Sequence, residues 1–247
     1  GFRGKALSEN FGGYWPEHNL YTEEYIQGET LDDYLKRNKE DIRDKARVDR
    51  WQMRWLHFIW SGVQAYQEFW ERTNLQLSIQ PPSPKNLIIP QHDYKNGSRL
   101  ISISSRKPVK SLTEHFLSLY TEYIVSTEKK YPGLNHMSDW EVIFTATIQA
   151  LKVKKGKKVL KKLKDEIESS NIAKECELIG LTKGRINQFL DEILNLGVLT
   201  KPVVFASLRY ERWLDLNPDA TMKAKSSILQ DLYKDYDLNS LLDEYPE

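Results

Sequence analysis

The stretch from about Ala46 to Thr73 constrains the fold of this chain more than any other. Its apolar residues recur at steps of three and four, which is the spacing of one face of an α-helix. The residues of this stripe are Val48, Trp51, Trp55, Ile59, Val63 (or Gly62), Tyr66 and Trp70. Met53, Leu56 and Trp60 widen the stripe. A helix with such a broad apolar surface is expected to be buried on more than one side and to carry the core.

A strand and a capped helix are predicted ahead of this central helix. Residues Leu20–Ile26 indicate a short strand, and Gly28 indicates the turn that ends it. Thr30 is suited to cap a helix, because its hydroxyl can accept a hydrogen bond from a free backbone N–H group. Asp32 and Asp33 then fall in the first turn, where the helix dipole favours negative charge.

Two apolar segments after the central helix predict a β-hairpin. Residues 86–90 read NLIIP, and residues 99–104 read RLISIS. The Asn96-Gly97 pair between them is a strong hairpin signal, because both residue types tolerate positive φ.

Helices are predicted to follow this hairpin. The first spans roughly residues 110–129, and Ser138 or Asp139 can cap the second, which reads WEVIFTATIQAL. Eight lysines then lie between residues 152 and 164. Within this lysine-rich stretch a helical stripe is kept by Val153, Leu160, Leu163 and Ile167.

The composition excludes several classes of protein and site. The 36 basic residues balance 35 acidic ones, so the charge of the whole molecule favours neither polyanions nor polycations. The single cysteine, Cys176, excludes an intrachain disulfide and a four-cysteine zinc site. No apolar run is long enough for a transmembrane helix, and the first residues lack a signal-peptide core. We therefore expect a globular chain of the cytoplasm, or another intracellular space, with no membrane association.

Two stretches, taken in order, resemble the C-terminal lobe of the protein-kinase and aminoglycoside-phosphotransferase family. The segment YTEEYIQGETLDDYL is similar to the hinge of these enzymes, and IQPPSPKNLII is similar to their catalytic loop, with the long helix between them. The RLISIS segment falls where the strand before the metal-binding D-F-G triplet belongs. The resemblance covers roughly residues 20–105 and implies a kinase-like lobe.

The same resemblance implies that the catalytic chemistry is missing. In the family, an Asp five positions before the catalytic-loop Asn accepts a proton, while that Asn and a second Asp hold Mg²⁺. Asn86 matches the Asn, but Pro81 stands at the base position and Ser104 or Ser105 at the position of the second Asp. Hydroxyl groups bind Mg²⁺ poorly without a carboxylate. A degenerate, pseudokinase-like lobe without catalytic residues is therefore expected.

The implied ligands follow from this pattern. No cofactor is expected, although Asn86 matches a cofactor-binding position. ATP and Mg²⁺ would be cofactors only under an alternative, in which the chain is part of an active phosphotransferase whose N-terminal lobe lies outside it. A further alternative is an ordinary helix–hairpin junction that mimics the pattern, and this is non-catalytic as well.

Other reactive or metal-binding groups are not indicated. Cys176 lies inside a predicted helix and is expected to be a small buried residue rather than a nucleophile. The five histidines show no paired spacing, so no metal site is expected. His92 and Asp93 are interpreted as solvated residues of the hairpin turn.

A segment near the C-terminus, IAKECELIGLTKGRINQFLDEILNLGVL, resembles a winged helix–turn–helix. It predicts a short helix over Ile172–Leu178, a turn at Gly180 and a second helix over Thr182–Leu196. Gly197 is expected to cap that helix, and a strand is expected to begin at Val198.

The resemblance implies that the start of the second helix can enter a DNA groove. Candidate contacts to nucleic acid on this helix are Thr182, Lys183, Arg185, Asn187 and Gln188. Candidate phosphate contacts on the preceding helix are Lys154, Lys157, Lys158 and Lys161. Winged helices often bind only proteins, however, and a lysine run is commonly a solvated helix face.

Together these patterns predict a mainly α fold with a small β component in two units. Residues 1–149 would form the kinase-like lobe, and residues 150–247 would form the winged-helix-like unit with an acidic tail. The leading hypothesis is a non-catalytic binding or scaffolding module within a larger protein or assembly. Its expected partner is a protein, and nucleic acid is the alternative partner through the second unit.

Overall fold

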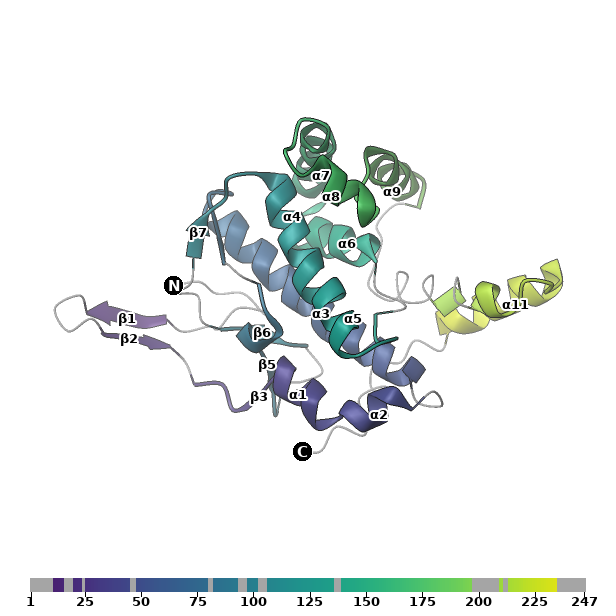
Figure 1. Cartoon of the computed structure of the whole chain (residues 1–247), viewed down its shortest axis with the longest axis horizontal. Coiled ribbons are helices and arrows are strands. Elements are labelled where there is room, and N and C mark those ends of the chain that lie inside the picture. Colours follow the sequence, from purple (N-terminus) through teal and green to yellow (C-terminus); the bar gives the residue numbers. More distant parts are fainter. Residues whose placement is uncertain are drawn as a thin grey trace.

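The computed structural model describes residues 11–15, 20–23, 25–44, 48–79, 82–92, 97–101, 106–135, 139–196, 209–210 and 213–234. These described residues are mainly helical, with three small antiparallel sheets (Figure 1). The predicted class, mainly α with a small β component, is confirmed. None of the described helices is both long enough and apolar enough to cross a membrane.

The predicted central helix is α3, Val48–Arg72, and it runs through the middle of the molecule (Figure 1). Every residue from Trp51 to Val63 is buried, as expected for a helix that is covered on more than one side. The helix α6, Trp140–Ala150, packs along it, and its N-cap is Asp139, whose carboxylate accepts a hydrogen bond from the Trp140 N–H. The aromatic stripe of α3 is therefore core, as predicted.

The N-terminal strands differ from the prediction. The strand β2 spans only Leu20–Glu23 and pairs with β1, Phe11–Trp15. Gly28 does not form the predicted turn, because it begins β3, Gly28–Thr30, and lies opposite Pro90. A Cβ atom at this position would clash with the backbone oxygen of Ile89. The glycine therefore permits two strands to approach closely, which is a second common use of this residue type.

The helix α1, Leu31–Arg37, begins where the sequence predicts. The Thr30 hydroxyl accepts a hydrogen bond from the Asp33 N–H at 3.1 Å, and Asp32 and Asp33 lie in the first turn. A short helix, α2, follows over Lys39–Arg43.

The region after α3 contains two small sheets. The strand β4, Leu77–Ile79, pairs with β7, Arg106–Pro108. Between them, β5 (Leu87–Pro90) and β6 (Arg99–Leu100) form the predicted hairpin, and β3 extends it to three strands in the order β3-β5-β6.

Small residues of α3 and the hairpin allow the hairpin to lie against the central helix. The Ser61 hydroxyl accepts a hydrogen bond from the Ser98 N–H at 2.8 Å, and the Ser98 hydroxyl donates to the Phe58 carbonyl at 2.8 Å. Gly97 has a φ of +91° and presses on Ser61, and a Cβ atom at Gly62 would lie 2.5 Å from the Leu87 side chain. The hairpin is thus fixed in position by close contacts with α3.

The helix predicted over residues 110–129 is present, with one irregularity. It consists of α4 (Leu112–Tyr120), a π-helical turn (Thr121–Val125) and α5 (Ser126–Lys130). The π-helical turn widens the helix locally and changes which side chains face the 3-10 turn beside it. Hydrophobic periodicity does not predict such a turn.

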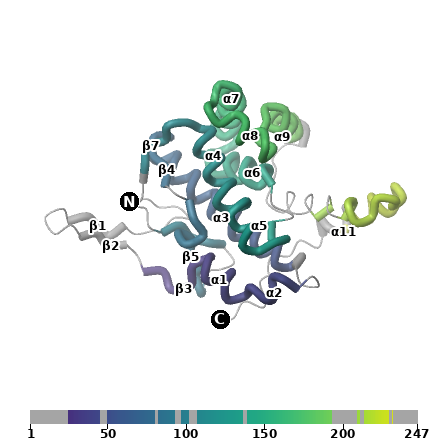
Figure 2. Tube along the Cα trace, viewed as in Figure 1, coloured from purple at the N-terminus to yellow at the C-terminus, as the bar shows by residue number. Residues whose placement is uncertain are grey.

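The C-terminal helices gather at one end of the molecule, opposite α1 and α2 (Figure 2). They are α7 (Val153–Ile167), α8 (Ala173–Leu178) and α9 (Lys183–Leu196), and α11 (Met222–Lys234) lies apart from them. Gly180 forms the predicted turn with a φ of +74°. The predicted cap at Gly197, the strand from Val198 and the acidic tail lie outside the described residues.

The buried face of α7 differs from the prediction at one residue. Leu160, Leu163 and Ile167 are buried, but Val153 is exposed. Val153 is the first residue of the helix, where the face turns away from the core, and Gly156 takes the buried position instead. A Cβ atom at Gly156 would lie 2.6 Å from the Ile148 Cα atom, so α7 and α6 approach closely at this point.

The predicted boundary between the two units falls between α6 and α7. Phe144, Leu160 and Phe189, which come from both sides of this boundary, all belong to the same hydrophobic core. The rings of Phe144 and Phe189 lie 5.2 Å apart. The division into two units stays a prediction.

Candidate functional site

The candidate site is built around the 3-10 turn Pro84–Asn86, which joins the end of β4 to β5. Ser83 caps this turn, because its hydroxyl accepts a hydrogen bond from the Lys85 N–H at 3.2 Å. Pro84 occupies the first position of the turn, where its fixed φ suits the backbone and its missing N–H is not needed.

Two buried tyrosines form hydrogen bonds with the backbone at the start of this turn. The Ser83 N–H donates to the Tyr66 hydroxyl at 3.2 Å, and the Tyr123 hydroxyl donates to the Ser83 carbonyl at 3.4 Å. The side chains of Tyr123 and Asn86 also hydrogen-bond to the Tyr66 hydroxyl. Burial raises the pKa of both tyrosines, so both hydroxyls stay protonated. Asn86 is thus part of a buried hydrogen-bond network that fixes the shape of the turn.

A pocket of about 500 Å³ opens beside the turn. We call it the turn pocket and define it by the residues Asp32, Leu35, Ser83, Pro84, Lys85, Asn86, Glu122, Ser126, Thr127, Lys130 and Tyr131. These residues come from α1, from the turn itself, and from the π-helical turn with α5. Its volume lies within the range of pockets that bind small ligands or short segments.

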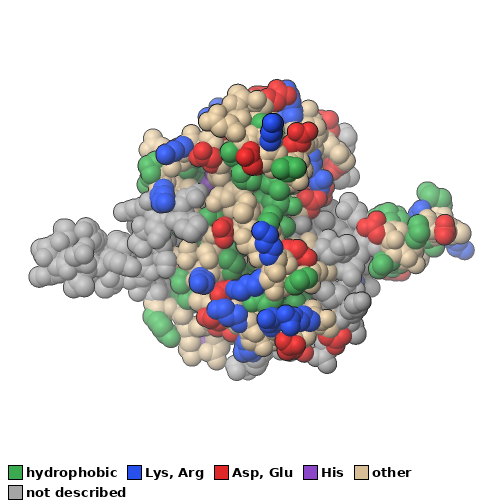
Figure 3. Space-filling view, viewed as in Figure 1, with side chains coloured by type: hydrophobic (Ala, Val, Ile, Leu, Met, Phe, Trp, Pro, Cys, Tyr) green, Lys and Arg blue, Asp and Glu red, His purple; other side chains and the backbone are tan. Residues whose placement is uncertain are grey.

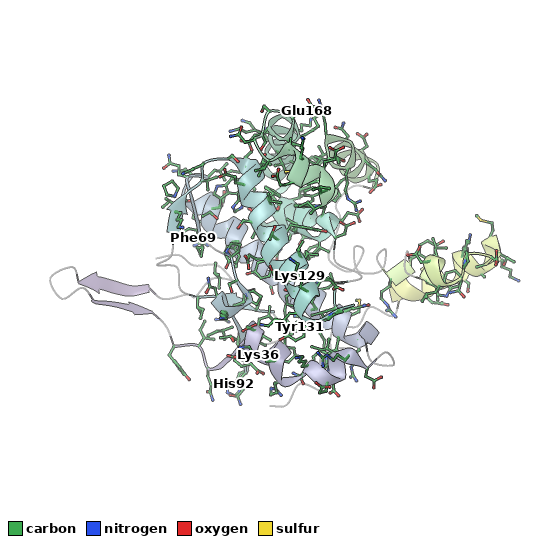
Figure 4. The ribbon with its side chains drawn as sticks, in the orientation of Figure 1. Lys36, Phe69, His92, Lys129, Tyr131 and Glu168 are labelled. Carbon is green, nitrogen blue, oxygen red and sulfur yellow. The ribbon has the colours of Figure 1, made fainter. Side chains whose placement is uncertain are left out.

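Two residues that line the turn pocket, Asp32 and Lys130, form a charged triad with Lys36. The Asp32 carboxylate lies 2.7 Å from the Lys130 ammonium and 2.8 Å from the Lys36 ammonium. Burial alone would raise the pKa of Asp32, but the hydrogen bonds and positive charges of the two lysines outweigh it and hold the pKa below its usual value. Asp32 is therefore ionised and joins α1 to the end of α5. Figure 4 labels Lys36 and Tyr131, which lie near each other in this region.

The sequence predicts little of this pocket. Asn86 matches a cofactor-binding position, but Asp32 has the pattern of an ordinary helix-start charge, and no sequence pattern indicates Glu122 or Lys130. Pro81, Ser104 and Ser105, the positions of the absent acids in the kinase-like pattern, lie outside the described residues. Among the residues that the structure describes, no group of three or more His, Cys, Asp or Glu side chains could hold a metal ion.

The candidate nucleic-acid contacts on α9 are engaged within the chain. The Arg185 guanidinium pairs with Asp139 and lies 3.8 Å from Glu141. Lys183 lies 3.1 Å from the Glu168 carboxylate.

The other polar residues of this face have structural or solvent-exposed positions. The Thr182 hydroxyl accepts a hydrogen bond from the Arg185 N–H at 3.2 Å, so it caps α9. The Gln188 amide donates to Glu192 at 3.0 Å, while Asn187 is exposed.

The candidate lysines of α7 lie on its outer surface. Lys154, Lys158 and Lys161 are exposed, and Lys157 is half-buried. Their neighbour Lys155 lies 3.2 Å from Glu71 of α3. These lysines form a largely solvated face of α7.

The chain matches no family model, no curated protein and no solved structure. The kinase-like and winged-helix resemblances therefore stay predictions from the sequence patterns.

The remaining reactive side chains are buried or exposed away from the turn pocket. Cys176 is fully buried, and burial raises the pKa of its thiol, as expected for a structural residue. His92 is exposed, as predicted, while Asp93 lies outside the described residues.

His115 of α4 is a buried residue whose role the sequence did not indicate. Its Nδ1 atom lies 3.0 Å from the Ser78 hydroxyl, and its Nε2 atom lies 3.2 Å from the Gln67 amide oxygen. Gln67 in turn donates to the Thr147 hydroxyl at 2.9 Å, so the network connects β4, α4, α3 and α6. Burial lowers the pKa of His115 to about 4, which keeps the ring neutral.

Proposed function

We propose that this chain is a non-catalytic binding module, a degenerate kinase-like lobe that scaffolds a protein partner in an intracellular assembly. The arrangement of strands supports the kinase-like part of the proposal. Because β4 pairs antiparallel with β7, the last residue of β4, Ile79, lies opposite the first residue of β7, Arg106. The β5–β6 hairpin lies between them in sequence, which is the order that the resemblance implies.

The observation that carries the proposal is the position of the Asn86 side chain. This residue is the one that matches a magnesium-binding position in the kinase-like pattern, yet its amide hydrogen-bonds to the Tyr66 hydroxyl. The Ser83 backbone is held by Tyr66 and Tyr123 in the same network. Asn86 therefore stabilises the turn, and the turn presents a fixed surface to the pocket.

The charged side chains around the turn support binding rather than phosphate transfer. A phosphotransferase needs carboxylates that are available to Mg²⁺ and to a substrate hydroxyl. The Asp32 carboxylate is already occupied by Lys36 and Lys130, and the sequence has Pro81 where the base would stand.

Calorimetric titration of the chain with ATP in the presence of MgCl₂ tests the non-catalytic part. We expect no metal-dependent heat of binding, either for the unmodified chain or for Asn86→Ala. Tight binding that requires Mg²⁺ and disappears in Asn86→Ala would overturn the proposal and support the active phosphotransferase fragment. Phosphate transfer by a longer form of the protein, lost in the same variant, would have the same meaning.

Site-specific photo-crosslinking tests the partner-binding part. A photo-reactive amino acid placed at Ser126, which is exposed in the turn pocket, should crosslink one defined protein in extract of the source cells. The matched control is the same amino acid at His92, which is also exposed but does not line this pocket. Equal crosslinking from both positions would contradict a partner site at the turn.

We do not extend the proposal to nucleic acid. The two basic residues among the candidate DNA contacts of α9, Lys183 and Arg185, form ion pairs with carboxylates of the same chain. A DNA phosphate would have to compete with these carboxylates. The exposed lysines of α7 offer only sequence-independent attraction.

A further inference from the structure

The turn pocket presents two opposite charges that the described part of the chain does not neutralise. The triad of Asp32, Lys36 and Lys130 is satisfied internally. Lys85 and Glu122 also line the pocket, and neither the Lys85 ammonium nor the Glu122 carboxylate forms an ion pair or a hydrogen bond with a residue that the structure describes. The pocket therefore offers a ligand one ammonium from the turn and one carboxylate from the π-helical turn.

The side chains of Lys85 and Glu122 differ in how far they are removed from water. The Lys85 side chain is exposed, whereas that of Glu122 is half-buried. A charge that is partly removed from water gains more from an opposite charge than a fully solvated one does. Glu122 is therefore the stronger determinant of a ligand's position, and Lys85 is the more adaptable one.

These charges disfavour ligands of a single sign. A phosphate or carboxylate that approaches Lys85 would also face Glu122, and a simple cation that approaches Glu122 would face Lys85 and Lys130. Like charges at close range cost free energy and select against such partners. A ligand that carries both signs satisfies both groups.

The rest of the pocket suits a peptide. Pro84 supplies half-buried apolar surface, Leu35 and Tyr131 lie buried beneath the pocket, and Ser126 is exposed where a peptide backbone could hydrogen-bond to its hydroxyl. Figure 3 shows Lys/Arg and Asp/Glu side chains interspersed on this face of the molecule, over α1 and α5. A polar rim around a small apolar area is typical of surfaces that bind proteins.

We propose that the turn pocket binds a short segment of the partner protein that carries one basic and one acidic side chain. The basic side chain pairs with Glu122, and the acidic side chain pairs with Lys85. This inference rests on the proposed function, because it names the chemistry that the partner presents to the same site.

The test uses short blocked peptides and the full chain, with binding followed by NMR shifts of backbone amides near the pocket. Ac-Lys-Ala-Glu-NH₂ and Ac-Glu-Ala-Lys-NH₂ carry both charges, while Ac-Lys-Ala-Gln-NH₂ and Ac-Gln-Ala-Glu-NH₂ carry one each. We expect one of the two mixed-charge peptides to bind about tenfold more tightly than either single-charge peptide. Equal affinities for all four peptides, or no binding of any, would overturn the inference.

Charge exchange within the pocket provides the second arm. Glu122→Lys and Lys85→Glu should each weaken the preferred peptide by about tenfold. The double variant should recover binding but prefer the peptide of reversed order. The matched control is Lys129→Glu, which alters an exposed lysine of α5 outside the pocket and should change nothing. Circular dichroism verifies that each variant is folded.

The outcomes separate this inference from the proposed function. If the peptides fail to bind but the Ser126 position still crosslinks a partner, the mixed-charge segment is wrong and the scaffolding function stands. If ATP binds with Mg²⁺, the proposed function fails, whatever the peptides do.

Discussion

The Asp32 carboxylate and the Lys130 ammonium lie 2.7 Å apart, although 98 positions separate them in the sequence. Their contact connects α1 to the last turn of α5, and both residues line the turn pocket. Lys36 binds the other carboxylate oxygen at 2.8 Å, so one buried anion holds two half-exposed cations. The triad therefore joins two of the elements that form the pocket.

Asp32→Asn should therefore lower the free energy of unfolding at neutral pH by about 1 kcal/mol, because the two lysines lose their shared counter-ion. The folded pKa of Asp32 is below its ordinary value of 3.8, so its contribution is complete above that pH and is lost as the pH falls through the folded pKa. The two proteins should converge in stability as the pH falls below the folded pKa of Asp32. Urea unfolding across this range checks the expectation.

Asp33→Asn is the matched control for this prediction. Asp33 occupies the next position of the same helix but is largely exposed and contacts Lys36 alone among the lysines, at 3.3 Å. Asp33→Asn should lower the free energy of unfolding by less than Asp32→Asn does. An equal loss from both variants would mean that the triad has no special role.

Glycine substitutions should separate steric clash from backbone strain. Gly97 has positive φ, and a Cβ atom there would clash with Ser61, so Gly97→Ala should cost more than about 2 kcal/mol. Gly180 also has positive φ but has open space around it, so Gly180→Ala should cost only the strain, about 1 kcal/mol. Thermal or urea unfolding measures all of these variants.

A substitution at Gly184 should change the free energy of unfolding in the opposite direction. Gly184 is the second residue of α9, and a Cβ atom there would meet only the Thr182 hydroxyl oxygen, at 3.9 Å. Gly184→Ala should raise the free energy of unfolding by about 0.5–1 kcal/mol, because alanine favours helix. If Gly97→Ala were as harmless as Gly184→Ala, the close contact between the hairpin and α3 would be wrong.

Local patterns account for the parts of the fold that could be predicted. The stripe of α3, the caps at Thr30 and Asp139, and the hairpin signal each depend on residues a few positions apart, and all three were found. Gly28 was misassigned because glycine serves both in turns and where strands approach closely. Its role is decided by Ile89, which lies far along the sequence.

The candidate site was largely hidden for the same reason. Asn86 could be found because it belongs to a contiguous motif. Lys130 and Glu122 could not, because each reaches the pocket only after α4 and α5 pack beside the turn. The π-helical turn that carries Glu122 has no signature in the hydrophobic pattern.

His115 should make the stability of the chain depend on pH in the weakly acidic range. Its folded pKa of about 4 lies below the ordinary value of 6.5, so the unfolded chain binds the proton more readily. The stability should fall by up to about 3 kcal/mol as the pH drops from 6.5 to 4. His115→Gln should be less stable at neutral pH, because the Ser78 contact is lost. Its stability should depend less on pH over this range.

His92→Gln is the control for the histidine prediction, because His92 is exposed and should leave the pH profile unchanged. A wild-type profile as flat as that of His115→Gln would show that the buried ring is not the group that titrates.

Arg185 gives the prediction that separates a structural from a nucleic-acid role for α9. Asp139 caps α6 and pairs with Arg185, and Asp139→Asn removes the charge while an asparagine can still cap the helix. A double-mutant cycle of Asp139→Asn and Arg185→Ala should give a coupling energy of about 0.5–1 kcal/mol, whereas Lys183→Ala with Glu168→Gln, an exposed pair, should give almost none.

The same ion pair predicts the result of a DNA-binding test. Because the Arg185 guanidinium is paired with Asp139 and is not available to a phosphate, the unmodified chain should not shift duplex DNA at low salt. A salt-sensitive shift that is lost in Lys183→Glu plus Arg185→Glu, together with no coupling between Arg185 and Asp139, would instead make α9 a DNA-binding helix.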